Sequence, residues 1–303
     1  MQAEMLFHWL DGHMKRILIA LFLTCAAVEA ASAADTRETV FWPVGDFPPS
    51  NIVSGPYKGQ GSSDQRRHSL IKRMPEFRHE VIEVPTTRSI DMLKSRPNVC
   101  QPNLLKTPER EEFLVFSARP FYILPNGIIT TRKRLPLFKP YLNEHGELRL
   151  ADFLADGTHR IGIISGRAFG AGIDPVLKKF AGQPSIVVVP SSDHLSSRLL
   201  KLANQNEFDA VIGYPYELRY LTRQLGFDER EFTLLPIAGV PVLTQSFVAC
   251  SKSELGKRVM SAIDRALEDG SVQRESDVAY RVWLDDETAA RFDRLLKQSQ
   301  RDK

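Results

Sequence analysis

Strand-like and helix-like patterns alternate along this chain in two successive cycles. The first cycle holds three strand patterns, at 39–44, 77–84 and 98–100. A helix pattern that begins near Ser62 separates the first two strands, and one that begins at Thr86 separates the last two. Alternation of this kind predicts a parallel sheet that is covered by helices and connected by right-handed crossovers.

The second cycle follows the same order further along the chain. Its strand patterns cover 160–164, 185–189, 208–213 and 232–237, and its helix patterns cover 174–180, 191–202 and the residues after Tyr216. A strand pattern at 122–132 leads into this cycle, and one at 242–251 leads out of it. Two helix patterns, 254–267 and 287–297, then end the chain, and we expect them to pack on the first of two α/β bodies.

The N-terminal segment has the features of an export signal. Lys15 and Arg16 precede an apolar run at 17–28, and a small-x-small exit ends at Ala33. This order is typical of a secretory signal peptide, so we predict cleavage after Ala33 and a periplasmic protein. Met14 is an alternative start of the chain.

Composition and the absence of certain sequence motifs exclude several classes of function. The formal net charge of +3 is too small and too evenly spread to indicate nucleic-acid binding. The hydrophobic content of 43% is enough for a buried core. The sequence has no phosphate-binding loop, nucleophile elbow or metal-ligand cluster. We therefore expect no cofactor, no metal and no enzymatic activity.

One polar turn carries the strongest binding signal. Thr107 is a hydroxyl N-cap, and Pro108 follows it at the first helical position. Arg110 then lies one short turn inside the helix, beside backbone amides that have no helical partner. A guanidinium in this position predicts a receptor for a carboxylate or phosphate. The alternative is a surface arginine paired with Glu109 or Glu112.

This turn and the residues after it resemble the family 3 extracellular solute-binding proteins, the substrate-capture components of ABC importers. In that family a Thr-x-x-Arg turn precedes an apolar run that ends in Phe-Ser-x-Pro-Tyr. Here the turn is Thr107 to Arg110, and the run ends in Phe116-Ser117-Ala118-Arg119-Pro120-Phe121-Tyr122. The resemblance implies that Arg110 grips an acid group of the ligand.

The resemblance also implies the type II periplasmic-binding-protein fold. That fold has two lobes, each a mainly parallel sheet flanked by helices, and two crossing strands join them. The expected boundaries place 1–33 in the removed segment, 34–123 with 246–303 in lobe one, and 124–245 in lobe two. In this topology Cys100 and Cys250 lie on neighbouring strands, so they form either a disulfide or two buried thiols.

Loop residues from both lobes are candidates for the wall of the ligand cleft. The candidates are Trp42, Asp46, Phe47, Arg88, Gln101, Asn103, Thr107 and Arg110 from lobe one, and Ser165, Arg167, Tyr214 and Tyr216 from lobe two. The alternative for Trp42 and the two tyrosines is core packing. For Asp46 it is capping of its own turn, and for Arg167 it is a solvated turn position.

The chain departs from the amino-acid-binding members of the family at two positions. They have an Asp where this chain has Tyr214, and a Thr where it has Arg167 and Ala168. These departures favour a small anionic or polar ligand over an α-amino acid. Two arginines from opposite lobes, Arg110 and Arg167, would hold such an anion.

The sequence thus favours a monomeric periplasmic solute-binding protein that delivers its ligand to a membrane permease of the ABC type. The first alternative is a ligand-sensing protein of the same fold that signals to a membrane receptor. An exported enzyme is the least favoured reading. Transport and sensing differ in the partner protein, which the patterns of this chain do not identify.

Overall fold

A computed structural model describes residues 35–189 and 207–301 of the chain. The predicted signal segment 1–33 and the predicted helix 191–202 lie outside these residues. Contacts divide the chain into residues 1–38 and a unit of 39–303, and both sheets belong to the second unit. Among the described residues, no helix has the length and hydrophobicity that a bilayer crossing requires.

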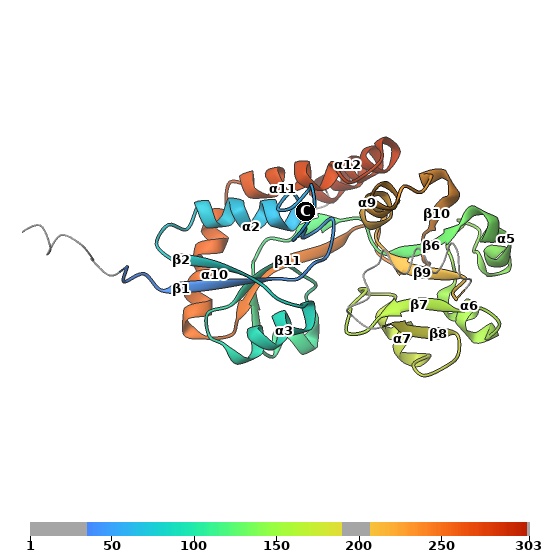
Figure 1. Cartoon of the computed structure of the whole chain (residues 1–303), viewed down its shortest axis with the longest axis horizontal. Helices are drawn as coiled ribbons and strands as arrows, with labels where there is room; N and C mark the ends of the chain where they lie inside the picture. Colours follow the sequence, from blue (N-terminus) through green and yellow to red (C-terminus); the bar gives the residue numbers. More distant parts are fainter. Residues whose placement is uncertain (1–34, 190–206, 302–303) are drawn as a thin grey trace, which may run out of the picture. The chain divides into compact units, whose positions relative to one another are not determined.

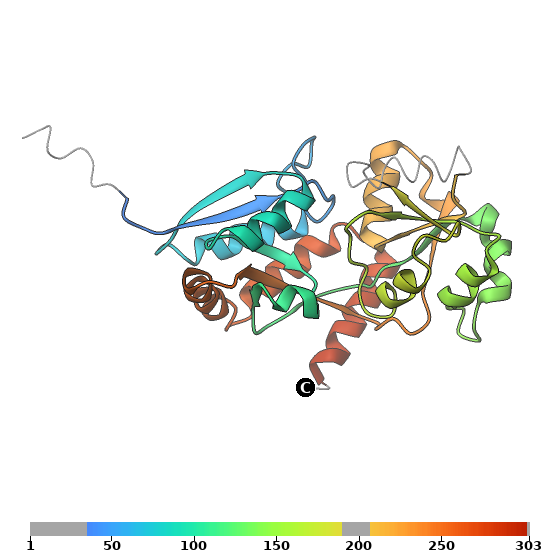
Figure 2. The ribbon, with the colours of Figure 1, turned by 90° about the horizontal axis from the view of Figure 1, so that it is seen from below.

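The first sheet begins with two parallel strands, β1 (Thr39–Val44) and β2 (Arg78–Glu83), which run side by side in Figure 2. Helix α2 (Ser62–Lys72) connects them, and α3 (Thr86–Ser95) leads on to β3 (Cys100–Leu104). A parallel bridge from Phe41 to Val99 joins this two-stranded sheet to the four-stranded sheet that contains β3, and the two together are called the first sheet. The parallel order that the alternating patterns predict is therefore present.

Strand β11 (Thr244–Ser251) completes this sheet from the far end of the sequence. It pairs in antiparallel fashion with β3 and with β4 (Leu114–Phe116), which follows the short helix α4 (Pro108–Glu111). The first residues of β11 also pair with β5 (Phe121–Ile123). The outgoing and returning segments of the chain thus lie side by side where they leave the first sheet.

The second sheet has five strands in the order β10-β6-β9-β7-β8. Their bounds are β6 Gly127–Thr131, β7 Ile161–Ile164, β8 Ile186–Val189, β9 Ala210–Gly213 and β10 Phe232–Leu235. Strand β7 is parallel to β8 and β9, whereas β6 is antiparallel to both of its neighbours. The predicted strand 122–132 is in fact two strands, β5 and β6.

Helices and short turns surround this second sheet. They are α5 (Leu135–Phe138), α6 (Leu150–Asp156), α7 (Asp174–Lys179), α9 (Pro215–Leu225) and the 3₁₀ turns η1 (Arg132–Arg134), η2 (Lys139–Tyr141) and η4 (Glu229–Glu231). One apolar core contains residues of α5, α6 and α7 together with β6, β7 and β9. A separate core contains residues of β1, β3 and β11.

The C-terminal helices pack on both groups of elements. Helix α10 (Glu254–Ala266) buries its apolar face in the first-sheet core, as expected. Helix α11 (Ser271–Arg281), which the patterns did not predict, lies beside α2 (Figure 1). Helix α12 (Asp286–Arg301) places Phe292 and Leu296 in a core that also contains residues of α9. Helix α12 therefore shares a core with α9 in addition to contacting α11, whereas packing on the first body was the expectation.

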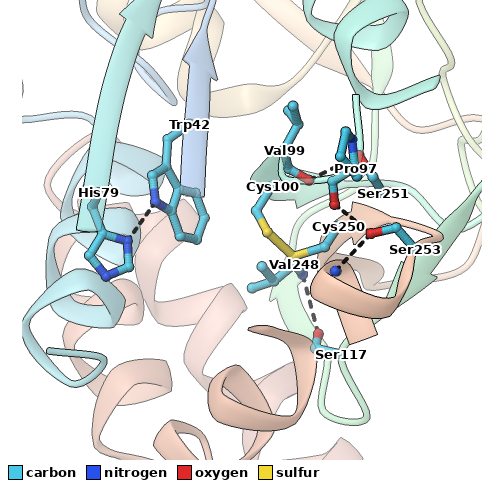
Figure 3. Close-up of a disulfide and its surroundings, with 11 residues drawn as sticks. Trp42, His79, Pro97, Val99, Cys100, Ser117, Val248, Cys250, Ser251 and Ser253 are labelled. Carbon is cyan, nitrogen blue, oxygen red and sulfur yellow. Dashed lines mark hydrogen bonds between the residues drawn. A yellow bond between two sulfur atoms is a disulfide. The ribbon is translucent and has the colours of Figure 1, made fainter. Parts of the chain in front are cut away.

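A disulfide joins Cys100 on β3 to Cys250 on β11, which are directly opposite each other in the strand pairing (Figure 3). The side chains around it tie the same strands to their neighbours. The Ser117 hydroxyl accepts a hydrogen bond from the Val248 amide, and the Ser253 hydroxyl donates to the Pro97 carbonyl. The returning strand is thereby fixed to the strand that leads into the Thr107 turn.

Candidate functional site

A cavity of about 210 Å³ lies where loops of the first sheet meet loops of the second. Nine of the twelve residues predicted from the sequence line it, namely Asp46, Phe47, Gln101, Asn103, Arg110, Ser165, Arg167, Tyr214 and Tyr216. A cavity of this size suits a small molecule.

Two glycines permit the close approach of the backbone that shapes this wall. A Cβ on Gly61 would lie 2.2 Å from the Ser50 carbonyl oxygen, so only glycine brings the start of α2 against that loop. As a result Ser62 and Ser63, the first residues of α2, line the cavity. Gly166 has φ of +72°, a left-handed conformation that glycine adopts without strain, and it turns Arg167 toward the cavity.

Arg110 lines the cavity from the end of the short helix α4. The Thr107 hydroxyl and carbonyl both accept from the Arg110 amide, so the predicted N-cap is present. The helix is only four residues long, and its Arg110 and Glu111 amides bond to Thr107 instead of remaining available for a ligand. The side chain is anchored by one bond, Nη1 to the Leu105 carbonyl at 2.8 Å. Burial lowers the pKa of the guanidinium.

The Arg110 guanidinium has no carboxylate within ion-pair distance in the part of the chain that the structure describes. The predicted alternative, a pairing with Glu109 or Glu112, is therefore absent. Its remaining N–H groups can reach an acid placed in the cavity.

Arg167 lines the cavity from the other side but is already paired. Its Nη1 donates to Glu217 Oε1 at 2.9 Å, and its Nη2 donates to Glu217 Oε2 at 2.7 Å. Nη2 also donates to Asn126 Oδ1 at 3.1 Å. The Arg167 and Glu217 side chains are 8% and 1% exposed. The expected two-arginine grip on an anion is therefore not present, because Glu217 neutralises Arg167.

Glu217 was not predicted, although the sequence contains a signal for it. Tyr214 is the N-cap of α9, and Glu217 stands three residues later, where a capping-box acid accepts from the N-cap amide. Glu217 Oε2 accepts from the Tyr214 amide at 2.8 Å. The same carboxylate thus caps the helix and holds Arg167.

Aromatic rings complete the wall contributed by the second sheet. Tyr214 and Tyr216 stack with ring centroids 5.1 Å apart, and burial raises the pKa of both hydroxyls. The Arg167 guanidinium lies 4.8 Å from the ring centroid of Phe47 and 5.2 Å from that of Tyr214. Phe47 belongs to a first-sheet loop, so these stacked groups connect the two walls of the cavity.

Arg66 is a cavity residue that the sequence reasoning missed. It is 3% exposed and lies on α2, four residues before the core residue Leu70. A charged residue on the apolar face of a predicted helix is the signal that would have found it. Its guanidinium stacks 3.6 Å from the ring centroid of Phe121. Burial lowers the pKa of Arg66 to about 9.

Three predicted residues do not line the cavity. Trp42 is fully buried in the first-sheet core, where its indole Nε1 donates to His79 Nδ1 at 3.1 Å (Figure 3). Core packing, the alternative reading of this residue, is what the structure shows. Arg88 is exposed on α3. Thr107 caps α4 and acts on the cavity only by positioning Arg110.

The remaining predicted first-sheet residues are held by hydrogen bonds within the first lobe. Gln101 Nε2 donates to the Pro43 carbonyl at 3.1 Å, and Asn103 Nδ2 donates to Ser50 Oγ at 2.9 Å. Asp46 Oδ1 accepts from the Val53 amide at 3.4 Å, which agrees with the alternative that Asp46 caps its own turn. All three side chains also face the cavity.

Comparisons with known proteins show the fold. No family model and no curated protein matches this sequence. A Listeria monocytogenes structure described as a putative L-cystine ABC transporter has a TM-score of 0.62 at 12% identity, over 82% of this chain and 97% of the other. The periplasmic VFT2 domain of BvgS from Bordetella pertussis has a TM-score of 0.59 at 20% identity, over 81% and 93%.

A third similar structure is an amino acid ABC transporter substrate-binding protein, AbpA from Streptococcus pneumoniae, bound to L-arginine. It has a TM-score of 0.57 at 16% identity, over 82% of this chain and 96% of the other. These similarities cover both sheets, and they agree with a chain that leaves the first sheet through β5 and returns through β11. The chain therefore has the two-lobed α/β fold of the type II periplasmic binding proteins.

Proposed function

We propose that this protein captures a small anionic solute in the cavity between its two lobes, as an exported solute-binding protein that serves a membrane permease. One observation carries the proposal: Arg110 lines the cavity with a guanidinium that makes no ion pair with a described carboxylate. An arginine fork is suited to a carboxylate or phosphate, which it can hold through two parallel hydrogen bonds.

The charge balance of the wall supports an anionic ligand. Three arginines and two carboxylates, Asp46 and Glu217, line the cavity, so these side chains have a net charge of +1. Glu217 is engaged by Arg167 and by the Tyr214 amide, and Asp46 bonds within its own loop. Tyr214 occupies the position where amino-acid-binding members place an Asp, which favours a ligand without an α-amino group.

The similar structures support binding and not catalysis. They include proteins described as ABC transporter substrate-binding proteins and a periplasmic domain of BvgS. We therefore expect ligand capture without turnover, in the periplasm, by a chain exported through the segment ending at Ala33. Delivery to a permease is the function that we favour, and ligand-dependent signalling to a membrane receptor is the alternative.

A thermal-shift screen tests the proposal. The panel contains small monoacids, diacids, amino acids and sugars. A ligand present at about 100 times its Kd stabilises the folded protein by about 2.7 kcal/mol, which raises the midpoint by about 5 °C for a chain of this size. We expect acids to give such shifts, and sugars and other neutral compounds to give none.

The variant Arg110→Ala should abolish these shifts and leave the unliganded midpoint within about 2 °C of the wild type. Arg88→Ala is the matched control, because Arg88 is an exposed first-lobe arginine outside the cavity. It should respond to ligand as the wild type does. Acid-dependent shifts that persist in Arg110→Ala would contradict the assignment, as would a large fall of its unliganded midpoint.

Uptake measurements separate transport from sensing once the screen has supplied a ligand. A strain that lacks the gene should lose high-affinity uptake of that radiolabelled ligand if the protein serves a permease. Unchanged uptake, together with loss of a ligand-dependent transcriptional response, would favour the sensing role instead.

A further inference from the structure

Arg66 is a buried cation whose contacts are all neutral. Its Nη1 donates to the Pro102 carbonyl at 2.7 Å and to Ser246 Oγ at 3.1 Å. Its Nε and Nη2 both donate to Ser276 Oγ at 3.1 Å. No described carboxylate lies within ion-pair distance of it, and Asp277 of α11 acts on its charge only at longer range. A charge removed from water in this way is costly unless an anion is brought to it.

In the same cavity, a carboxylate of the protein compensates the positive charge of Arg167. Both side chains are more than nine-tenths buried and both face the cavity. Arg167 has a bidentate carboxylate, whereas Arg66 has two hydroxyls and a carbonyl. The different partners indicate different roles, because a buried charge without a counterion in contact carries a desolvation cost that a bound anion would offset.

The hydrogen bonds of Arg66 leave one of its own donors available. A guanidinium has five N–H groups, and the four bonds above leave one N–H of Nη2 without an acceptor among the described residues. Ser246 also lines the cavity, and a hydroxyl that accepts from Arg66 still has its own proton to donate. Ser62 and Ser63 of α2 lie on the same wall.

Arg66 and Arg110 are anchored in different places. Arg66 is held between α2, the start of β11 and the middle of α11 through Ser246 and Ser276. Arg110 is held beside α4 through the Leu105 carbonyl. The cavity therefore has two separate cationic positions in the first lobe, and one acid group on the ligand would compensate only one of them.

We propose that Arg66 is a second anion-binding residue of this cavity and that the ligand is a small diacid, one acid group held at Arg110 and the other at Arg66. This proposal rests on the proposed function, since it assumes that the cavity binds an anionic solute. It adds that specificity for a diacid comes from two arginines of the first lobe. The second lobe contributes an aromatic wall in which Glu217 neutralises Arg167.

Matched ligands test the proposal without altering the protein. Glutarate and succinate are compared by calorimetry with their monoamides, glutaramate and succinamate, which have the same shape and one acid group. Loss of a charge-assisted hydrogen bond should weaken binding of each monoamide by about 10- to 100-fold. Monoamides that bind as tightly as the diacids would overturn the assignment.

The variant Arg66→Gln tests whether Arg66 is the residue that distinguishes a diacid from its monoamide. It should bring the affinity ratio of glutarate to glutaramate close to one, while the monoamide still binds through Arg110. Arg66→Lys keeps the charge and should restore part of the ratio. A purely structural Arg66 would instead lower the affinity for both ligands equally and leave their ratio unchanged, which would contradict the proposal.

The outcomes also separate this proposal from the proposed function. If monoacids and diacids shift the wild-type midpoint equally and Arg110→Ala abolishes both shifts, the anion site stands and the role of Arg66 is refuted. If no acid in either series binds the wild-type protein, the anion site at Arg110 fails, and the diacid assignment fails with it.

Discussion

The two walls of the cavity contain buried arginines that differ in whether a carboxylate of the protein pairs with them. In the second lobe, Arg167 makes a bidentate pair with Glu217 and stacks against Phe47 and Tyr214. Among the described residues, Arg66 and Arg110 of the first lobe bond only to carbonyls and hydroxyls. Positive charge is therefore available to a ligand from one wall, although arginines are present on both.

This difference shows that the presence of an arginine in a cleft does not define an anion site. What defines it is whether the fold has already supplied the counterion. Removing one member of a completed buried pair leaves the other charge uncompensated, whereas removing an uncompensated charge relieves a cost. The following predictions test this contrast between the two walls by their effects on stability.

The largest effect is expected in the second lobe. Glu217→Gln leaves the Arg167 charge buried without its partner and weakens the cap of α9, so it should lower the free energy of unfolding by about 3–5 kcal/mol. Chemical denaturation measures the change. Glu229→Gln is the control, since its pair with Arg219 is 40% exposed on the carboxylate side and should contribute less than about 1 kcal/mol. Equal losses in both variants would contradict the comparison.

An intermediate effect is expected from Asp277, an acid of α11 that interacts with Arg66 only at longer range. Burial raises its pKa from 3.8 to about 6, and the charges of Arg281 and Arg66 oppose this rise. An acid with a raised pKa binds its proton more tightly in the folded state. Its stabilising contribution is therefore fully present below about pH 4 and is lost as the pH rises through about 6.

Asp277→Asn should remove this pH dependence. The wild type should lose about 2 kcal/mol more than the variant between pH 4 and pH 7, measured by denaturation at each pH. Wild-type and variant curves that run parallel over this range would show that Asp277 titrates normally. The cation at Arg66 would then have a charged acid at longer range already at low pH, which would weaken the contrast with Arg167.

The smallest effect on stability is expected from Arg66 itself. Arg66→Met removes four hydrogen bonds but also removes a buried charge that Asp277 compensates only at longer range, so the two changes should nearly cancel within about 1 kcal/mol. Unfolding of the unliganded protein measures this change. A loss as large as that of Glu217→Gln would show that Arg66 is as structural as the pair in the second lobe.

The sequence patterns predicted the alternation of strands and helices and most of the cavity residues, because these depend on local signals. The N-cap at Thr107 positions Arg110, and the turn at Gly166 positions Arg167, as the residue types indicate. The state of each arginine depends on contacts distant in sequence. Glu217 is 50 residues from Arg167, and Ser276 is 210 residues from Arg66, so no local pattern distinguishes the paired arginine from the unpaired one.

Tertiary packing also determines where Trp42 and the C-terminal helices lie. An aromatic residue beside a loop is equally suited to a cleft or a core, and the contact with His79 on the neighbouring strand places Trp42 in the core. Helix α11 buries Val272 and Tyr280, but polar residues between them weaken its apolar periodicity. The packing partner of α12 depends on where α9 lies, and the sequence of α12 alone does not indicate this.

The disulfide between Cys100 and Cys250 has a consequence for proteolysis. The two cysteines are 150 residues apart, and every strand of the second sheet lies between them. A protease that cuts one bond anywhere in this interval produces two fragments that stay covalently joined until a reductant is added. Nicked molecules would therefore migrate as intact chains on a non-reducing gel, and the second lobe would remain attached to the first after such damage.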